Sequence, residues 1–307
     1  MWSAPVGEGA KRNRGGSLGM QIGAHVSTGG GLANAVERGS ERGCESIQIF
    51  HQNPRMWRPT AYTEEDFAAF REAFKASELT SVVIHAVYLI NCASRERPVR
   101  TKSLASLKHA LNVGDAIGSS GVVLHAGSTK GDPMDEAIER AGAAIKEALA
   151  ESDSCPLLLE NTAGTQGPLG RNFDELKRLL DAGGAGERLG VCIDCCHLFA
   201  SGYDIRNEDS LAEVVNELEA AFSLDRVQCL HVNDSAVPMG SNRDRHANLG
   251  KGKLGRAGIR AFLSEPRFDG LPAIAETAGP DKRGPDRKEV ATAKRLRREG
   301  LKRRADS

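Results

Sequence analysis

The chain has 307 residues, of which 40% are apolar and 27% are charged, and its 41 basic and 41 acidic side chains balance. A chain of this length can bury a full hydrophobic core, either as one α/β barrel of about 250 residues or as two smaller domains. No apolar run approaches the roughly 18 residues of a membrane helix, and seven cysteines are too sparse for a disulfide scaffold, so we expect a soluble, cytoplasmic protein with reduced and mostly buried thiols.

The two ends of the chain differ in composition from the middle. Residues 1–19 are rich in Gly and Arg and lack the apolar segment of a signal peptide, so we expect a disordered N-terminal extension. Residues 281–307 carry eleven Lys or Arg against five Asp or Glu. We expect residues 282–307 to form a basic C-terminal helix and tail, either as a solvated surface element or as a contact for nucleic acid.

Eight short apolar segments between residues 21 and 276 are predicted to be strands. They are too short and too rich in β-branched residues for helices, and a continuous apolar run is typical of a strand buried on both faces. Each segment also carries a His, Asp or Glu at or near its C-terminal end. The segments are residues 21–26, 46–51, 81–85, 121–125, 156–160, 189–194, 227–231 and 272–276.

Segments with helical periodicity lie between these strands. Thr63 precedes three acidic residues and indicates the start of a helix, in which Phe67, Phe70 and Phe74 share one face. The spacing of Asn172 and Glu175 resembles a capping box at the start of another helix. The remaining helical patterns lie within residues 104–111, 134–145, 176–180, 211–218, 259–263 and 290–301.

Strand and helix thus alternate eight times along the chain. Parallel strands need crossover connections of this kind, and eight such units close into a (β/α)8 barrel. A doubly wound sheet has the same alternation, but the three glycines at residues 29–31 lack the spacing of a dinucleotide-binding fold. We therefore predict an α/β protein with a single-domain TIM barrel at residues 20–281.

Chemistry in such barrels collects at the C-terminal ends of the strands. A single histidine is most often a structural residue, but here seven of the eight histidines lie at strand ends or in the loops just beyond them. Only His109 falls within a predicted helix, where we expect it on the surface. The candidates at the strand ends are His25, His51, His85, His125, Glu160, Asp194, His231 and Glu276, and the loops add His197, Asp244 and His246.

Mixed histidine and carboxylate ligands favour zinc or manganese over calcium, which prefers oxygen ligands alone. Nine or more candidates exceed the needs of one ion, so we expect a cluster of two or three, bridged by a carboxylate. Such clusters typically stabilise both the attacking and the leaving oxygen at phosphorus and generate hydroxide at neutral pH. The sequence therefore predicts a hydrolase that acts at a phosphate ester.

Five ordered motifs resemble the endonuclease IV family of zinc-dependent apurinic/apyrimidinic endonucleases. The similarity extends from about Gln21 to about Asp281, which is nearly the whole predicted barrel. The motifs are residues 23–27 (GAHVS), 160–164 (ENTAG), 191–197 (VCIDCCH), 231–234 (HVND) and 243–246 (RDRH).

The resemblance implies three zinc ions, with manganese as an alternative ion, and nine ligands. It implies that His85 and His125 hold the first ion and that Glu160 is shared between the first and second ions. Asp194, His231 and Glu276 would complete the second ion's ligands. His197, Asp244 and His246 would hold the third. We assign the catalytic roles to Glu160 and Glu276. His25 and His51 match no ligand position in the family.

The resemblance also implies contacts with duplex DNA. Arg55 and Tyr88 match positions at which the family inserts side chains into the duplex at the damaged site, whereas Trp57 is expected to pack under its loop. The loops at residues 164–170 and 241–245 are expected to lie against the DNA backbone. Arg243 and Arg245 are assigned to DNA binding, with the orientation of neighbouring ligands as the alternative role.

The function implied is a DNA-repair endonuclease. It would act as a monomer on duplex DNA, hydrolyse the phosphodiester 5′ to an abasic site with a zinc-bound hydroxide, leave a 3′-hydroxyl and also remove 3′ blocking groups. A metal-dependent sugar isomerase or epimerase of the related barrel type is the main alternative, but it would need fewer ligands and no third site. A third hypothesis is an inactive barrel that only binds damaged DNA.

Overall fold

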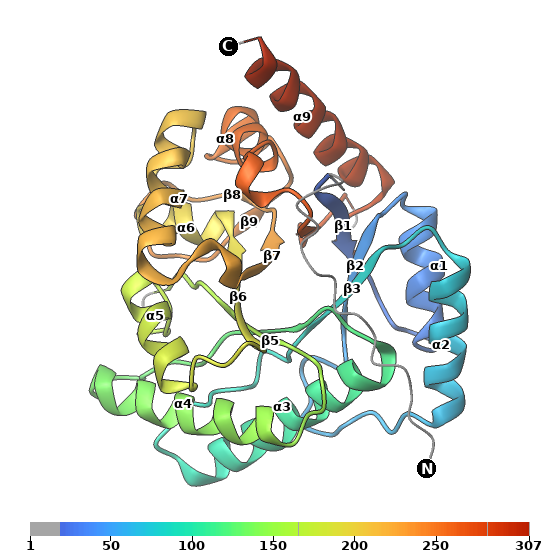
Figure 1. Cartoon of the computed structure of the whole chain (residues 1–307), viewed down its shortest axis with the longest axis vertical. Coiled ribbons are helices and arrows are strands. Elements are labelled where there is room, and N and C mark those ends of the chain that lie inside the picture. Colours follow the sequence, from blue (N-terminus) through green and yellow to red (C-terminus); the bar gives the residue numbers. More distant parts are fainter. Residues whose placement is uncertain (1–18, 165, 281, 307) are drawn as a thin grey trace.

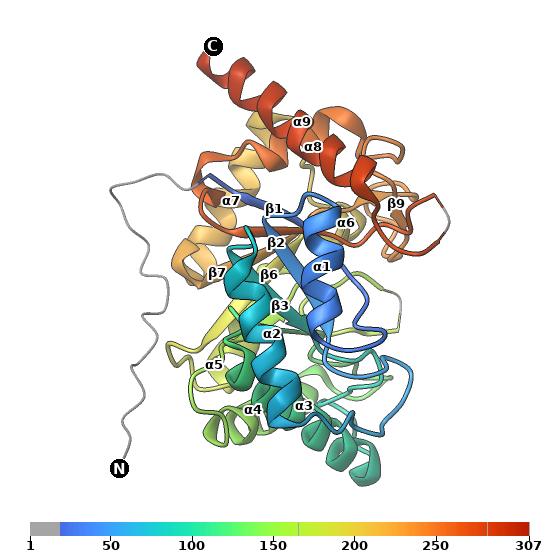
Figure 2. The same cartoon turned by 90° about the vertical axis from the view of Figure 1, so that its right-hand side faces the viewer.

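The computed structural model describes residues 19–164, 166–280 and 282–306. The predicted N-terminal extension therefore lies outside the described residues, except for residue 19. The described part of the chain forms a ring of helices around a closed barrel of strands, with the C-terminal helix on one side (Figures 1 and 2).

The barrel consists of eight parallel strands, which confirms the predicted fold and all eight predicted strand positions to within one or two residues. Its strand order is β1-β10-β7-β6-β5-β4-β3-β2, so each strand pairs with the next one of the barrel along the chain. The strands are β1 (Gln21–His25), β2 (Ser46–Phe50), β3 (Ser81–His85), β4 (Val122–Leu124), β5 (Leu157–Glu160), β6 (Leu189–Asp194), β7 (Val227–His231) and β10 (Pro272–Ala275).

Helices cover the outside of the barrel, and every predicted helical pattern lies in one of them. They are α1 (Ala33–Glu41), α2 (Glu64–Ala76), α3 (Arg97–Ile117), α4 (Met134–Ala150), α5 (Phe173–Ala182), α6 (Cys195–Ser201), α7 (Glu208–Phe222), α8 (Gly255–Leu263) and α9 (Arg287–Ala305). Short 3-10 turns, η1 (Leu224–Arg226) and η2 (Pro266–Phe268), precede β7 and β10. The sequence patterns did not predict α1, α6 or the small hairpin of β8 (Asp234–Ser235) and β9 (His246–Ala247).

The two predicted helix starts differ from each other in their capping. At α2, the Thr63 side chain accepts from the backbone N–H of Asp66, and the Asp66 side chain accepts from the N–H of Thr63, so the capping box is complete. At α5, Asn172 accepts from the N–H of Glu175, but the Glu175 carboxylate accepts from Gly170 and Arg171 instead. Glu175 thus fixes the loop before the helix as well as the helix start.

The barrel interior holds a small apolar layer that is separate from the main core between strands and helices. Its members are fully buried, and each lies on a different strand: Val83, Val123, Leu158, Cys192, Cys229 and Ile274. Side chains in a strand alternate between the two faces with a period of two residues. The residue two positions farther along each of these strands therefore points into the barrel as well, directly above the apolar layer.

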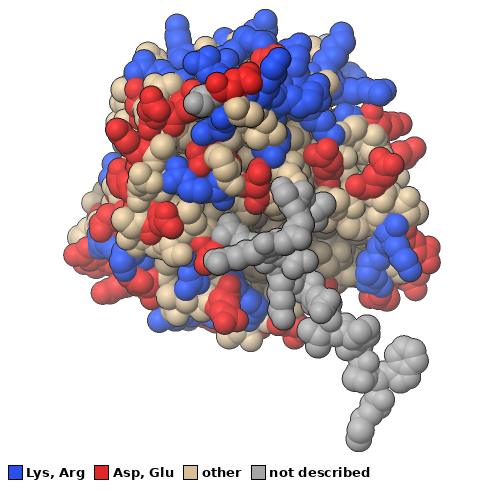
Figure 3. Space-filling model, turned by 45° about the horizontal axis from the view of Figure 1, so that its top comes forward, with Lys and Arg blue, Asp and Glu red and all other residues tan. Residues whose placement is uncertain are grey.

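The basic C-terminal segment forms α9, which packs against α8 and β1 with Val290, Ala293 and Leu296 buried. Its outer face carries Lys and Arg side chains, and Figure 3 shows blue side chains gathered along the top of the molecule, where α9 lies. Among the described residues, no helix has both the length and the apolar character that a membrane crossing requires.

Candidate metal centre

Six of the nine predicted ligands lie two residues beyond a member of the apolar layer. They are His85, His125, Glu160, Asp194, His231 and Glu276, on or just after β3, β4, β5, β6, β7 and β10. Because the strands are parallel, these side chains all meet at the same end of the barrel. The alternation that fills the barrel with Val, Leu, Ile and Cys thus also places the six ligands above it.

The other three predicted ligands reach this end of the barrel through local structure. The Asp194 side chain caps α6 by accepting from the N–H of His197 at 2.8 Å, so β6 leads into the helix without a loop and His197 lies beside Asp194. His246 is brought in by the antiparallel pairing of β9 with β8, in which Ser235 lies opposite His246. Asp244 precedes this strand and has a half-exposed side chain.

The nine residues form three adjoining groups. His85, His125 and Glu160 make one group, and Glu160, Asp194, His231 and Glu276 make a second, with the ligand atoms of each group within 4.8 Å of one another. In the third, Asp244 lies 3.4 Å from Nε2 of His197 and 3.2 Å from Nε2 of His246. Asp194 also lies close to His197 and His246 and so joins the second and third groups.

The hydrogen bonds of His85 and His197 identify which ring nitrogen is free. Nδ1 of His85 lies 2.6 Å from the carbonyl oxygen of Ala86, and Nδ1 of His197 lies 2.9 Å from that of Asn161. A carbonyl oxygen only accepts, so both Nδ1 atoms carry the proton and both Nε2 atoms present a lone pair. Those lone pairs face carboxylate oxygens, at 3.3 Å from Glu160 and 3.4 Å from Asp244.

Two acceptors that face each other at this distance repel unless a cation lies with them. One such cation is a second proton on the histidine, and the other is a metal ion. Burial lowers the pKa of His197, but Asp194 and Asp244 outweigh it and raise the pKa well above its ordinary value. For Glu160 the two effects have the opposite signs. Burial raises its pKa, but His125 and His231 outweigh burial and hold the pKa well below its usual range. In the metal-free chain, the raised pKa of His197 thus places a second proton between this ring and Asp244, at a position that suits a metal ion.

Three buried ligand atoms have no hydrogen-bond partner among the described residues: Oε2 of Glu160, Nε2 of His197 and Nε2 of His246. Buried polar atoms without a partner are uncommon in folded proteins and point to an ion or water at the position. Imidazole and carboxylate groups are the ligands that zinc prefers together with thiolate. The residues at this end of the barrel therefore fit divalent metal ions.

Two buried asparagines that were not predicted as functional residues brace the centre. Asn161 donates to the backbone oxygen of Asp194 and accepts from its N–H. Asn233 donates to the Asp194 carboxylate at 2.7 Å and accepts from the N–H of Glu276 at 2.9 Å. Asn161 comes directly after the predicted ligand Glu160, and Asn233 follows the predicted ligand His231 by two residues. This proximity within two of the motifs is the sequence signal that could have identified both asparagines.

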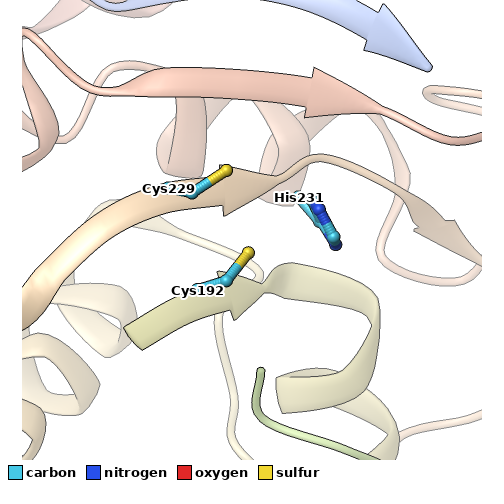
Figure 4. Close-up of side chains that lie close together, drawn as sticks. All are labelled: Cys192, Cys229 and His231. Carbon is cyan, nitrogen blue, oxygen red and sulfur yellow. The ribbon is translucent and has the colours of Figure 1, made fainter. Parts of the chain in front are cut away.

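A further group includes two cysteines. Cys192, Cys229 and His231 offer ligand atoms within 4.8 Å of one another, and Figure 4 shows Cys192 on β6 and Cys229 on β7 side by side near His231. Burial and the neighbouring Cys229 raise the pKa of the Cys192 thiol well above its ordinary value, and a protonated thiol is a poor ligand. All seven cysteines are free and buried, as predicted, and these two belong to the apolar layer.

His25, His51 and His109 lie outside the three groups. His51 is fully buried and contacts His109 with 5.3 Å between ring centroids. The prediction that His109 is a surface residue is wrong, because its ring is partly buried against His51 and its Nε2 is enclosed with no hydrogen-bond partner in the described part of the chain. The position of His109 in a helix did not reveal this burial, because its partner His51 lies far away in the sequence, directly after β2.

The predicted DNA contacts lie at the rim of the barrel. Tyr88 is 65% exposed, and its ring contacts Phe50 in a T-shaped arrangement and His85 in a tilted one. Arg243 and Arg245 are exposed as well, as is Arg55. Trp57 is partly buried against the main core, as expected. A cavity of about 370 Å³ opens beside the centre, and Tyr88, His125, Lys130 and Asp244 contribute to its lining.

The comparisons with known proteins agree with this geometry. Residues 36–299 match the family model described as xylose isomerase-like TIM barrel. The probable endonuclease 4 of Citrifermentans bemidjiense is 39% identical over 90% of this chain and 97% of that protein. The chain belongs to the endonuclease IV family.

Solved structures point to the same family. The crystal structure of endonuclease IV from Thermus thermophilus superposes with a TM-score of 0.78 at 36% identity, over 92% of this chain and 99% of that one. A D-tagatose 3-epimerase-like protein superposes with a TM-score of 0.66 but is only 17% identical, over 92% of this chain and 97% of that one. The likeness to the epimerase shows a common fold, whereas the likeness to endonuclease IV extends to the sequence.

Proposed function

We propose that this chain hydrolyses the phosphodiester bond 5′ to abasic sites in duplex DNA and leaves a 3′-hydroxyl. Membership of the endonuclease IV family makes it a nuclease of DNA repair, and the proposal adds the substrate, the side of cleavage and the ions. Removal of 3′ blocking groups is a second reaction of the same site, because it also breaks an ester bond at a 3′ phosphorus.

The observation that carries the proposal is the set of lone pairs that face carboxylates at the end of the barrel. We propose that three zinc ions resolve these contacts: one between His85, His125 and Glu160, one among Glu160, Asp194, His231 and Glu276, and one among His197, Asp244 and His246. When bound, such ions lower the pKa of a coordinated water and neutralise charge on attacking and leaving oxygens.

The chain's own residues contribute position and charge. Glu160 directs Oε2 to His85 and His125 and Oε1 to His231, so one carboxylate joins two groups. We propose Glu160 and Glu276 as the catalytic carboxylates on this basis. Asp244 has the most exposed side chain of the nine predicted ligands, so we propose that an incoming phosphate meets the third group first.

Damage recognition is proposed to depend on the rim. An enzyme that acts at a missing base must distinguish an empty position from a stacked base pair. Tyr88 has an exposed aromatic ring next to the centre, and Arg55 has an exposed cation on the loop after β2. Arg243 and Arg245 flank Asp244 and are proposed to contact phosphates, which attract Lys and Arg independently of sequence.

A cleavage assay with defined ends tests this proposal. The zinc-loaded chain is incubated with a 5′-labelled duplex that contains one abasic site, and the product is then offered to a DNA polymerase. We expect a single cut whose labelled product is extended, because only a 3′-hydroxyl primes synthesis. An intact duplex, or a labelled product that carries the sugar remnant and is not extended, would contradict the assignment.

A further inference from the structure

Gln48 lies inside the barrel on β2, a strand that supplies none of the predicted metal ligands. Its side chain is fully buried, and an amide in such a place costs free energy unless its polar atoms have partners. Gln48 has three: its Oε1 lies 2.8 Å from Nε2 of His231, and its Nε2 lies 2.6 Å from Oε1 of Glu276 and 3.2 Å from Nδ1 of His25.

The contact with His231 determines where that ring carries its proton. A carboxamide oxygen only accepts hydrogen bonds, so Nε2 of His231 donates to Gln48 and Nδ1 is left with a lone pair. Nδ1 lies 3.0 Å from Oε1 of Glu160 and 3.2 Å from Oε2 of Glu276. The lone pair therefore points into the second ligand group.

The contact with Gln48 gives the two carboxylate oxygens of Glu276 different partners. Oε1 accepts from Gln48, whereas Oε2 faces Nδ1 of His231 and accepts from Asn233 at 3.3 Å. The carboxylate also fixes the orientation of the amide, because its oxygen requires the NH2 end of Gln48 on its side. One buried amide thus orients a histidine and a carboxylate that both belong to the same group.

We propose that Gln48 is a positioning residue for the metal ion held by Glu160, Asp194, His231 and Glu276, which it serves by fixing the tautomer of His231 and the rotamer of Glu276. This inference rests on the proposed function for the presence of that ion. Hydrogen-bonding partners of metal ligands typically change metal affinity or activity about 10- to 100-fold when they are removed. The effect should be confined to one of the three positions, because the ligands that Gln48 contacts both belong to the second group.

Two substitutions disturb these contacts in different ways. Gln48→Met keeps the length of the side chain and removes the hydrogen bonds to His231, Glu276 and His25. Gln48→Glu keeps an acceptor for His231 but places a second carboxylate beside Glu276, which like charges disfavour. Gln52→Met is the matched control, because Gln52 is a buried glutamine four residues away that donates to the backbone oxygen of Met56 instead of to a ligand.

The measurement is zinc content and zinc affinity of the full chain, by elemental analysis and by competition with a chelator. We expect Gln48→Met to weaken one binding step about 10- to 100-fold and to lose one ion per chain on dialysis, with the other two retained. Gln48→Glu should weaken the same step, and Gln52→Met should match the unsubstituted chain. Unchanged affinity in Gln48→Met, or an equal loss in Gln52→Met, would overturn the inference.

The ring proton of His231 gives a second readout that needs no variant. In the zinc-loaded chain, and in the metal-free chain at high pH, nitrogen NMR of the imidazole should find the His231 proton on Nε2. A proton on Nδ1 would overturn the inference even if the variants failed to fold. A chain that binds no zinc at all would contradict the proposed function, whereas the high-pH spectrum would still decide the role of Gln48.

Discussion

The candidate metal centre and the rim of the barrel are neighbours, but their side chains differ in burial and in the number of polar partners. Glu160, Asp194 and His231 are buried, and each has several polar partners within the barrel. Tyr88 and Arg243 at the rim are exposed. A tightly connected group fails as a unit when one member is changed, whereas an exposed side chain contributes separately. We therefore expect large, coupled effects at the centre and small, separable effects at the rim.

The largest effect is expected for Glu160→Gln. An amide keeps the shape of the side chain but not the charge that joins two ligand groups, and metal-assisted charge stabilisation amounts to several kcal/mol. Each 1.36 kcal/mol is about tenfold in rate, so single-turnover cleavage should fall about 100- to 1,000-fold. Affinity for an abasic duplex should change far less, because we propose that the rim holds the DNA.

The matched control for this variant is Glu265→Gln, which changes a buried carboxylate that bonds Arg267 and Arg304 instead of a predicted ligand. It should lower the melting temperature and leave cleavage by the folded protein unchanged. Parallel losses of cleavage and DNA binding in Glu160→Gln would count against a bridging role.

Asn233→Ala should have the next largest effect, although Asn233 is not a predicted ligand. Its amide donates to Asp194 and to Glu276 and so braces two carboxylates of one group. Loss of such a partner typically costs about 10- to 100-fold in metal affinity or activity. Zinc affinity by chelator competition measures this, and an unchanged value would show that the strands alone position the ligands.

At the rim, Tyr88→Ala and Arg55→Ala should reduce discrimination between abasic and intact duplex. Stacking on a base is worth about 1–3 kcal/mol by alanine substitution in single-strand binders, so we expect about a tenfold loss in the ratio of affinities. The 65% exposure of Tyr88 predicts an unchanged melting temperature. Competition binding beside a thermal melt measures both, and Tyr88→Phe serves as the conservative control.

A lowered melting temperature with an unchanged binding ratio would assign Tyr88 to packing against Phe50 and His85 instead of to the DNA. Damage recognition would then have to come from other side chains of the rim.

The smallest effect is expected for Arg243→Ala. A single phosphate contact weakens binding to abasic and intact duplexes alike, and its loss lowers the slope of log affinity against log salt by about one. Cleavage of bound substrate should stay the same. If Arg243 instead orients Asp244, cleavage will fall at saturating DNA and the salt slope will not change, so a salt titration separates the two roles.

The contrast between centre and rim also explains what the sequence could predict. The barrel and its eight strands follow from the period of apolar runs, because a strand buried on both faces leaves a clear pattern. The strand-end residues follow from the barrel rule, and their division into ions came from the family resemblance. Local pattern did not predict α6 or the β8–β9 hairpin, which depend on a side-chain cap at Asp194 and on pairing between segments that are not adjacent in the chain.

Residues that act through other residues were harder to predict. Asn161 and Asn233 lie close to ligands in two of the motifs, but they carry no charge, and Gln48 occurs in ordinary strand sequence; their contacts with ligands are what indicate a role. His51 and His109 show the opposite case, in which the residue type suggests a ligand but the contacts do not. His51 lies at a strand end and His109 in a helix, and they contact each other away from the three groups. Residue type and strand position identify candidates, but tertiary contacts decide between them.

The central claim is that metal ions complete the nine-residue centre and that cleavage depends on them. The direct test is to remove the ions with a chelator, verify the loss by elemental analysis, and measure cleavage of an abasic duplex before and after zinc is returned. We predict close to three zinc ions per chain at the start, no cleavage in the metal-free protein and full recovery with zinc. Full cleavage by a chain shown to be free of metal would contradict the account.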